Sequence, residues 1–387
     1  MKIICVKYRI GIKKTIHDYI SFFPILLADY RLDPKHKDII NELLEKKYVN
    51  LNENCENNKR IINILLDFEH KDILKFVLTK FSIDLDYSDD DGNTPLMSLI
   101  LDYNFRYEDD IINLILDGTK NIDKQNIMGD TALILAVKYD LLHIIEKLLK
   151  KNVNIDIQNI DKNNALLLSL NKNHLIFDKL LEKNPNIDLK DKDGNTALML
   201  AIFTDNENIT YEILQKNPDL NIQNNNGYTS LMLAVATKYN MENTINEILK
   251  KDQEIDLMCN DGYNALMYSI MYNKENIMEK ILNKGANINI INKNNGKTPL
   301  MTAIEYSRDN IIEKLLERNP DINIINNDGE TALMMALEYS SDNIIEKFLE
   351  KNPKINIKNN KGKTALMIAK DLKKENIAKK ILEKLQK

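Results

Sequence analysis

The sequence is poor in the residues from which many compact sites are built. Its 387 residues include only 3 cysteines, 5 histidines, 11 glycines and 8 prolines, and no tryptophan. Cys5, Cys55 and Cys259 are scattered and lack the spacing of zinc ligands, which argues against a metal site and against a disulfide framework. Free cysteines are typical of a reducing compartment. We therefore expect an intracellular, cytoplasmic protein that carries no metal and no other cofactor.

Long hydrophobic runs and an excess of basic charge are also missing. Charged residues interrupt the apolar N-terminus, and the run 20–28 is too short to span a bilayer and contains Pro24. The formal net charge is −5, whereas a dedicated nucleic-acid binder normally shows a basic stripe and a high isoelectric point. We expect no membrane insertion and no nucleic-acid partner.

Two segments imitate the end of a phosphate-binding loop. Gly296 and Gly362 are each followed by Lys-Thr, but a P-loop needs another glycine five positions earlier, where Ile291 and Ile357 stand. The segments 89–92 and 191–194 similarly imitate a calcium loop. Its twelfth position needs a bidentate glutamate, and Ser98 and Leu200 stand there.

The histidines are isolated and show no metal-binding spacing, and no serine lies in a Gly-x-Ser-x-Gly elbow. We expect no enzymatic activity and no small-molecule substrate.

What the chain does contain is one segment in many copies. The copy at 328–336 reads Asp-Gly-Glu-Thr-Ala-Leu-Met-Met-Ala, and a degenerate copy without the glycine lies at Lys162. Successive copies are 37, 33, 32, 33, 35, 34, 33 and 33 residues apart. Eight of the 11 glycines occupy the same position in this segment: Gly92, Gly129, Gly194, Gly227, Gly262, Gly296, Gly329 and Gly362. A fixed period near 33 residues predicts a solenoid of stacked units.

Each unit can be predicted in outline from the copy at Gly329. The preceding Asn-Asn-Asp and the glycine favour a turn with left-handed backbone. Thr331 stands where a helix N-cap belongs, and Pro95 and Pro299 follow the equivalent threonine at the first helical position. A second helix over 344–351 has apolar residues at i, i+1, i+4 and i+5, and Asn-Pro ends it. The unit is therefore a turn followed by two antiparallel helices.

These features resemble the ankyrin repeat, whose unit of about 33 residues contains a turn and two helices and a Thr-Pro-Leu-His tetrapeptide. The resemblance implies an all-α solenoid of about nine to ten stacked repeats over 54–387, the last one a C-terminal cap, after a divergent N-terminal helical region, 1–53. In place of the tetrapeptide histidine, which usually hydrogen-bonds neighbouring loops, the chain has methionine, as at Met334. We expect packing to replace polar links between repeats. Lys162, standing where a turn glycine is expected, predicts a local weak point.

An ankyrin domain binds through its concave face, which implies a protein partner and a non-catalytic scaffold that acts as a monomer. Aromatic residues recur on the segments that would form this face. A solenoid turns one repeat position into a row, and a row of tyrosines suits protein binding. The alternative is that the rings pack over the neighbouring helix and only close the stack. The candidate binding residues are Tyr139, Phe203, Tyr228, Tyr263, Tyr272, Tyr306 and Tyr339.

A second hypothesis is an adaptor in which residues 1–53 recruit another partner. The chain also resembles the AT-rich ankyrin proteins of large DNA viruses and intracellular bacteria, which implies a host-directed effector acting in the host cytoplasm.

Overall fold

The computed structural model describes residues 44–45, 51–52, 60–67, 71–101, 109–239 and 241–385. In this part of the chain there are twenty helices and no strand, and a single β-bridge joins Ile325 to Thr331. The predicted all-α repeat architecture is confirmed. The predicted N-terminal region and the boundary at residue 54 lie largely outside the described residues. No described helix has both the length and the apolarity that crossing a membrane requires.

The chain divides into two compact units, Met1–Asn186 and Ile187–Lys387. The first unit contains α4 (Ile61–Asp67), α5 (Lys71–Lys80), α6 (Pro95–Leu101), α7 (Asp109–Gly118), α8 (Ala132–Lys138), α9 (Leu142–Leu149), α10 (Ala165–Ser169) and α11 (His174–Leu181). The second unit contains α12 (Ala197–Phe203), α13 (Glu207–Gln215), α14 (Ser230–Ala236), α15 (Glu242–Lys250), α16 (Ala265–Met271), α17 (Glu275–Asn283), α18 (Pro299–Glu305), α19 (Asp309–Glu317), α20 (Ala332–Tyr339), α21 (Asp342–Glu350), α22 (Ala365–Asp371) and α23 (Glu375–Leu385).

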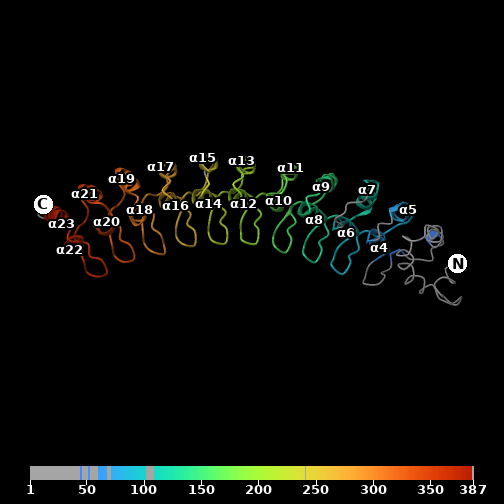
Figure 1. The fold of residues 1–387 in the computed structure, drawn as a ribbon, viewed down its shortest axis with the longest axis horizontal. Coiled ribbons are helices and arrows are strands. Elements are labelled where there is room, and N and C mark those ends of the chain that lie inside the picture. The colour runs from blue at the N-terminus through green and yellow to red at the C-terminus, as the bar shows by residue number, and fades with distance from the viewer. Residues whose placement is uncertain are drawn as a thin grey trace. The chain divides into compact units, whose positions relative to one another are not determined.

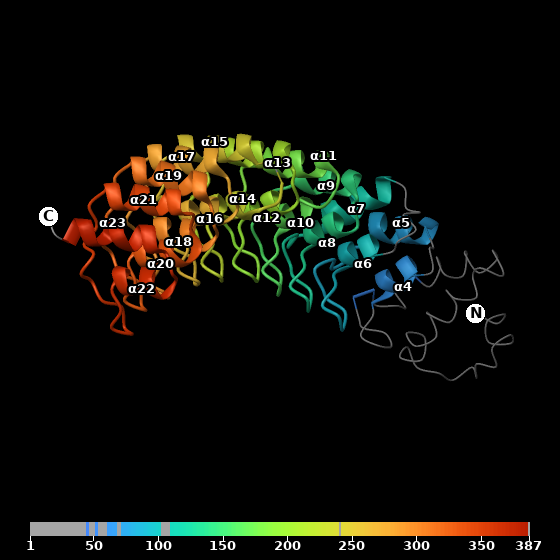
Figure 2. The ribbon, with the colours of Figure 1, turned by 60° about the vertical axis from the view of Figure 1, so that its left-hand side comes forward.

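Within each unit the repeats stack side by side (Figure 1). The even-numbered helices are the first helices of their repeats and form one row, and the odd-numbered second helices form another. Loops project from the side of the first helices, as Figure 2 shows. We call the surface made by the loop tips and the first helices of a unit its first-helix face.

Local sequence explains where the helices begin and end. The side chain of Thr331 accepts a hydrogen bond from the Met334 amide and caps α20, as predicted. In the degenerate copy Asn164 caps α10 in the same way, bonding the Leu167 amide at 2.9 Å. Asn352 adopts the left-handed φ of 52° after α21, which directs the chain away from the helix axis before Pro353. The predicted stripe of α21 is buried: Ile344, Ile345, Phe348 and Leu349.

The eight glycines of the repeated segment, which we call the signature glycines, satisfy two requirements at once. All eight have a φ between 73° and 82°, in the left-handed region. A Cβ on Gly329 would also lie 2.7 Å from the Asn360 side-chain oxygen and 2.9 Å from the Asn360 amide nitrogen of the next repeat. Gly362, in the last repeat, meets nothing within 4 Å. The sequence predicts the first requirement, and only the stack reveals the second.

Polar links between repeats are present, and the prediction that packing replaces them is wrong. Met334 is buried and fills space as expected, but in five successive loop tips of the second unit an asparagine donates its side-chain N–H to a backbone carbonyl of the preceding tip. These bonds measure 2.9 to 3.0 Å. We call this series the asparagine ladder; it consists of Asn225, Asn260, Asn294, Asn327 and Asn360. The asparagines of the turn thus supply the links that the missing histidine does not.

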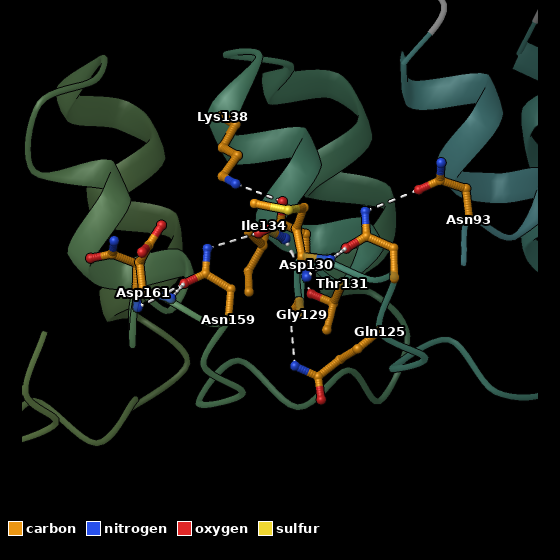
Figure 3. A network of polar contacts seen from close by, with 12 residues as sticks. Asn93, Gln125, Gly129, Asp130, Thr131, Ile134, Lys138, Asn159 and Asp161 are labelled. Carbon is orange, nitrogen blue, oxygen red and sulfur yellow. Dashed lines mark hydrogen bonds and ion pairs between the residues drawn. The ribbon is translucent and has the colours of Figure 1, made fainter. Parts of the chain in front are cut away.

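A second polar network links the repeats of the first unit (Figure 3), and its asparagine–asparagine bond recurs between Asn224 and Asn195 of the second unit. Asp130 is 3% exposed and accepts a hydrogen bond from the Asn159 side chain at 2.8 Å. The Lys138 ammonium lies 2.6 Å from the other oxygen of the same carboxylate. One repeat earlier, Asn126 donates to the Asn93 side chain at 3.0 Å. Because Asp130 is both paired and hydrogen-bonded, its burial is tolerated.

Lys162 has a φ of 57°, so the position is left-handed although it lacks a glycine. Replacing Lys162 by Gly should relieve this strain and raise the free energy of unfolding by about 1 kcal/mol. Chemical denaturation of the whole chain measures the change. Lys162→Ala is the control, because it removes the charged side chain but keeps the Cβ. An equal gain in both variants would show that backbone strain is not the cause.

Candidate functional site

Three tyrosines stand ten residues after their signature glycines, in consecutive repeats of the second unit. Tyr272 and Tyr306 are the C-caps of α16 and α18, and Tyr339 is the last residue of α20. Their exposed fractions are 50%, 37% and 56%, respectively. These three rings therefore occur at one repeat position and are accessible to solvent on the first-helix face.

At one end of this row the rings meet in a cluster. The Tyr268 ring lies 5.7 Å from the Tyr228 ring, 5.8 Å from the Tyr263 ring and 6.3 Å from the Tyr272 ring, centroid to centroid. These separations are typical of favourable aromatic contacts. We call these four residues the tyrosine cluster. The sequence identified three of its members and missed Tyr268, the ring that joins them.

Tyr268 is 4% exposed, and its hydroxyl has two partners. It donates to the Tyr228 hydroxyl at 3.0 Å and lies 3.3 Å from the sulfur of Cys259, which is a buried free thiol. Burial raises the pKa of Tyr268 far above its usual value, and the bonds to Cys259 and Tyr228 act in the same direction. The centre of the cluster is thus a neutral, fully partnered phenol.

Tyr306, in the repeat after Tyr272, lies near both aromatic and charged side chains. Burial raises its pKa, and the neighbouring Tyr263 and Glu305 add to this effect. The Lys297 ammonium, which acts in the opposite direction on Tyr306, lies 2.6 Å from the Glu305 carboxylate. The face therefore combines exposed rings with an ion pair whose two charges satisfy each other.

Two predicted site residues belong neither to the tyrosine cluster nor to the row of Tyr272, Tyr306 and Tyr339. Phe203 is the last residue of α12 and 52% exposed, so its ring is available although it is not a member of the cluster. Tyr139 belongs to the first unit, where it is the half-buried C-cap of α8.

Comparison with known families identifies the repeat. A model of three ankyrin repeats matches residues 101–191, 166–241, 233–326 and 319–387, so the matches together cover most of the chain. The chain belongs to the ankyrin repeat family. No curated protein sequence matches it. Ankyrin repeats are generally protein–protein interaction modules, and the family is typically non-enzymatic.

The sequence-based prediction missed the charged side chains at two positions of this ankyrin repeat, one and nine residues after the signature glycine. In three repeats these positions form an ion pair across the first helix. The pairs are Asp130–Lys138, Lys297–Glu305 and Lys363–Asp371, with N–O distances of 2.6, 2.6 and 2.7 Å. In the repeat of α20 both positions are acidic, Glu330 and Glu338. Aligning the repeats on the glycine would have shown this difference.

The second helices of the second unit carry a groove of about 870 Å³ beside α15. Its lining includes Tyr211, Asn246, Lys250 and Lys280, and the ammonium of Lys280 lies 2.5 Å from the Glu242 carboxylate. The lysines are held in ion pairs typical of a solvated helix surface. This groove shows no convergent set of groups that would favour catalysis.

Proposed function

We propose that this ankyrin repeat protein is a non-catalytic scaffold that binds a protein partner through the first-helix face of its second unit. The observation that carries the proposal is the exposure of Tyr272, Tyr306 and Tyr339 at one repeat position. Tyrosine offers a large, stiff apolar ring with a polar end, and it is enriched among the residues that dominate binding energy in interfaces. The buried free thiol of Cys259 supports action in a reducing, intracellular compartment.

The surface is also ordered before any partner arrives. Tyr272 is held by its stacked contact with Tyr268, with an interplanar angle of 19°. A ring that is already fixed loses little side-chain entropy on binding, so more of its contact energy contributes to affinity. The tyrosine cluster thus supports Tyr272, which is one of the three exposed rings.

The test is affinity capture with the whole chain, comparing wild type with the triple variant Tyr272→Ala, Tyr306→Ala and Tyr339→Ala. We expect the triple variant to lose its partner by at least roughly tenfold, because each exposed ring contributes about 1 kcal/mol or more when it is an anchor. Tyr211→Ala is the matched control, since Tyr211 is 53% exposed on the second helix α13.

Capture that survives the triple variant but fails with Tyr211→Ala would place binding on the second helices and overturn the proposal. Circular dichroism checks that the variants keep their helices. Tyr306→Ala with Tyr339→Ala alone tests the face without disturbing the stack beneath Tyr272.

A further inference from the structure

The repeat of α20 lacks the internal charge balance of its neighbours. In the repeats before and after it, the positions one and nine after the glycine hold the ion pairs Lys297–Glu305 and Lys363–Asp371. The pairs show that side chains at these two positions reach each other. Glu330 and Glu338 occupy the same positions, so this repeat has two like charges where the adjacent repeats have opposite ones. Like charges at such a distance destabilise the free protein.

The two lysines of the adjacent repeats already have carboxylate partners in their own repeats. Lys297 and Lys363 are engaged by Glu305 and Asp371. The Lys363 pKa is raised mainly by its bond with Asp371, and Glu338 adds a smaller contribution. The three repeats therefore place four carboxylates, Glu305, Glu330, Glu338 and Asp371, against two ammonium groups at these six positions. At these six positions the carboxylates outnumber the ammonium groups by two.

By repeat position the two glutamates lie near the most exposed ring of the tyrosine row, because the equivalent Glu305 and Tyr306 of the preceding repeat interact electrostatically. Tyr339 follows Glu338 directly and is 56% exposed. Carboxylates next to an open aromatic face match the two ends of an arginine side chain, which pairs with carboxylates through its planar donors and stacks on aromatic rings. A lysine satisfies the charge but not the stacking geometry.

Resting on the proposed function, we infer that the partner is a protein segment with a basic side chain, preferably arginine, and that this side chain docks between Glu330, Glu338 and Tyr339. The partner's cation takes the place that Lys297 and Lys363 fill in the adjacent repeats. Binding relieves the repulsion between the two glutamates, so charge complementarity selects this partner and Tyr272 and Tyr306 extend the contact.

The probe is a random peptide library displayed on phage and selected on the whole wild-type chain. We expect the selected peptides to be rich in arginine and to bind less tightly as ionic strength rises. Glu330→Lys should weaken them roughly tenfold, because it creates an internal pair with Glu338 in place of the partner's cation. Its thermal midpoint should be no lower than that of wild type, so lost binding cannot be ascribed to unfolding.

Neutralisation by Glu330→Gln with Glu338→Gln should weaken the peptides similarly. Its matched control is Glu350→Gln with Glu383→Gln, two exposed glutamates on the second helices α21 and α23. The control should leave affinity unchanged.

The outcomes separate this inference from the proposed function. Peptides without basic residues, or basic peptides that bind Glu330→Lys as well as wild type, overturn the inference. If those peptides still fail to bind the triple tyrosine variant, the proposed function of the first-helix face is retained. Peptides that tolerate both sets of changes, or a selection that yields no binder, count against both.

Discussion

Replacing Gly329 by Ala is expected to lower the free energy of unfolding by about 2 kcal/mol, and replacing Gly362 by Ala by about 1 kcal/mol. Both glycines have a φ of 74°, so the backbone strain of an alanine is the same. Only at Gly329 does the new methyl also meet the next repeat, where Asn360 bonds the Asn327 carbonyl at 2.9 Å. Moving Asn360 away weakens its hydrogen bond to the Asn327 carbonyl, which is part of the asparagine ladder.

Equilibrium denaturation of the two variants measures the difference, which isolates the interface between repeats from the turn itself. Asn360→Ala combined with each glycine variant gives the control. Truncating Asn360 should remove the part of the extra cost at Gly329 that comes from the Asn360 side chain and its hydrogen bond, while the close contact with the Asn360 amide nitrogen remains. Equal losses in the single variants would show that φ alone explains the glycines.

The features set by neighbours in the sequence could be predicted. The Thr331 cap, the start of α18 at Pro299 and the apolar stripe of α21 depend on residues within a few positions of each other. Each of these features recurs with the period of about 33 residues, so a correct prediction for one repeat applies to the others. The Lys162 turn was predicted for the same reason, since a left-handed φ is a property of one residue and its own turn.

Features that depend on register between repeats could not be predicted. Asparagines such as Asn327 were expected to serve their own turn, and nothing nearby in sequence shows that the side chain reaches the Asn294 carbonyl of the preceding repeat. The same limit explains the incorrect prediction about polar links. A missing histidine indicates that one hydrogen bond is absent, but it does not reveal which other residue links the repeats.

The repeat predicted the positions of the candidate residues but left their exposure open, and it missed Tyr268, whose role depends on packing. Tyr272, Tyr306 and Tyr339 share a position at the end of a first helix, so one argument covered all three. Tyr268 occupies a position that holds Thr302 and Met335 in the next two repeats, and all three are buried. Its sequence context indicates only core, whereas its ring contacts show that it joins the cluster.

Replacing Tyr268 by Ala is expected to lower the free energy of unfolding by about 3 kcal/mol, because a buried ring leaves a cavity beneath the first-helix face. Tyr268→Phe keeps the ring and should cost only about 1 kcal/mol, the value of the hydrogen bonds to Tyr228 and Cys259. For partner binding we expect Tyr268→Ala to weaken capture by releasing Tyr272, and Tyr268→Phe to preserve it. Loss of capture in both variants would mean that the hydroxyl, rather than the support of the ring, matters.

The pH dependence of these variants gives an independent check. Burial raises the pKa of Tyr268, so the fold favours the neutral phenol, while the unfolded chain releases this proton at a pH of about 10. The contribution of the hydroxyl is therefore fully present below that pH and is lost as the pH rises above it. The stability difference between wild type and Tyr268→Phe should shrink in alkaline denaturation series. A constant difference would mean that the Tyr268 hydroxyl titrates normally, and that water rather than Cys259 and Tyr228 surrounds it.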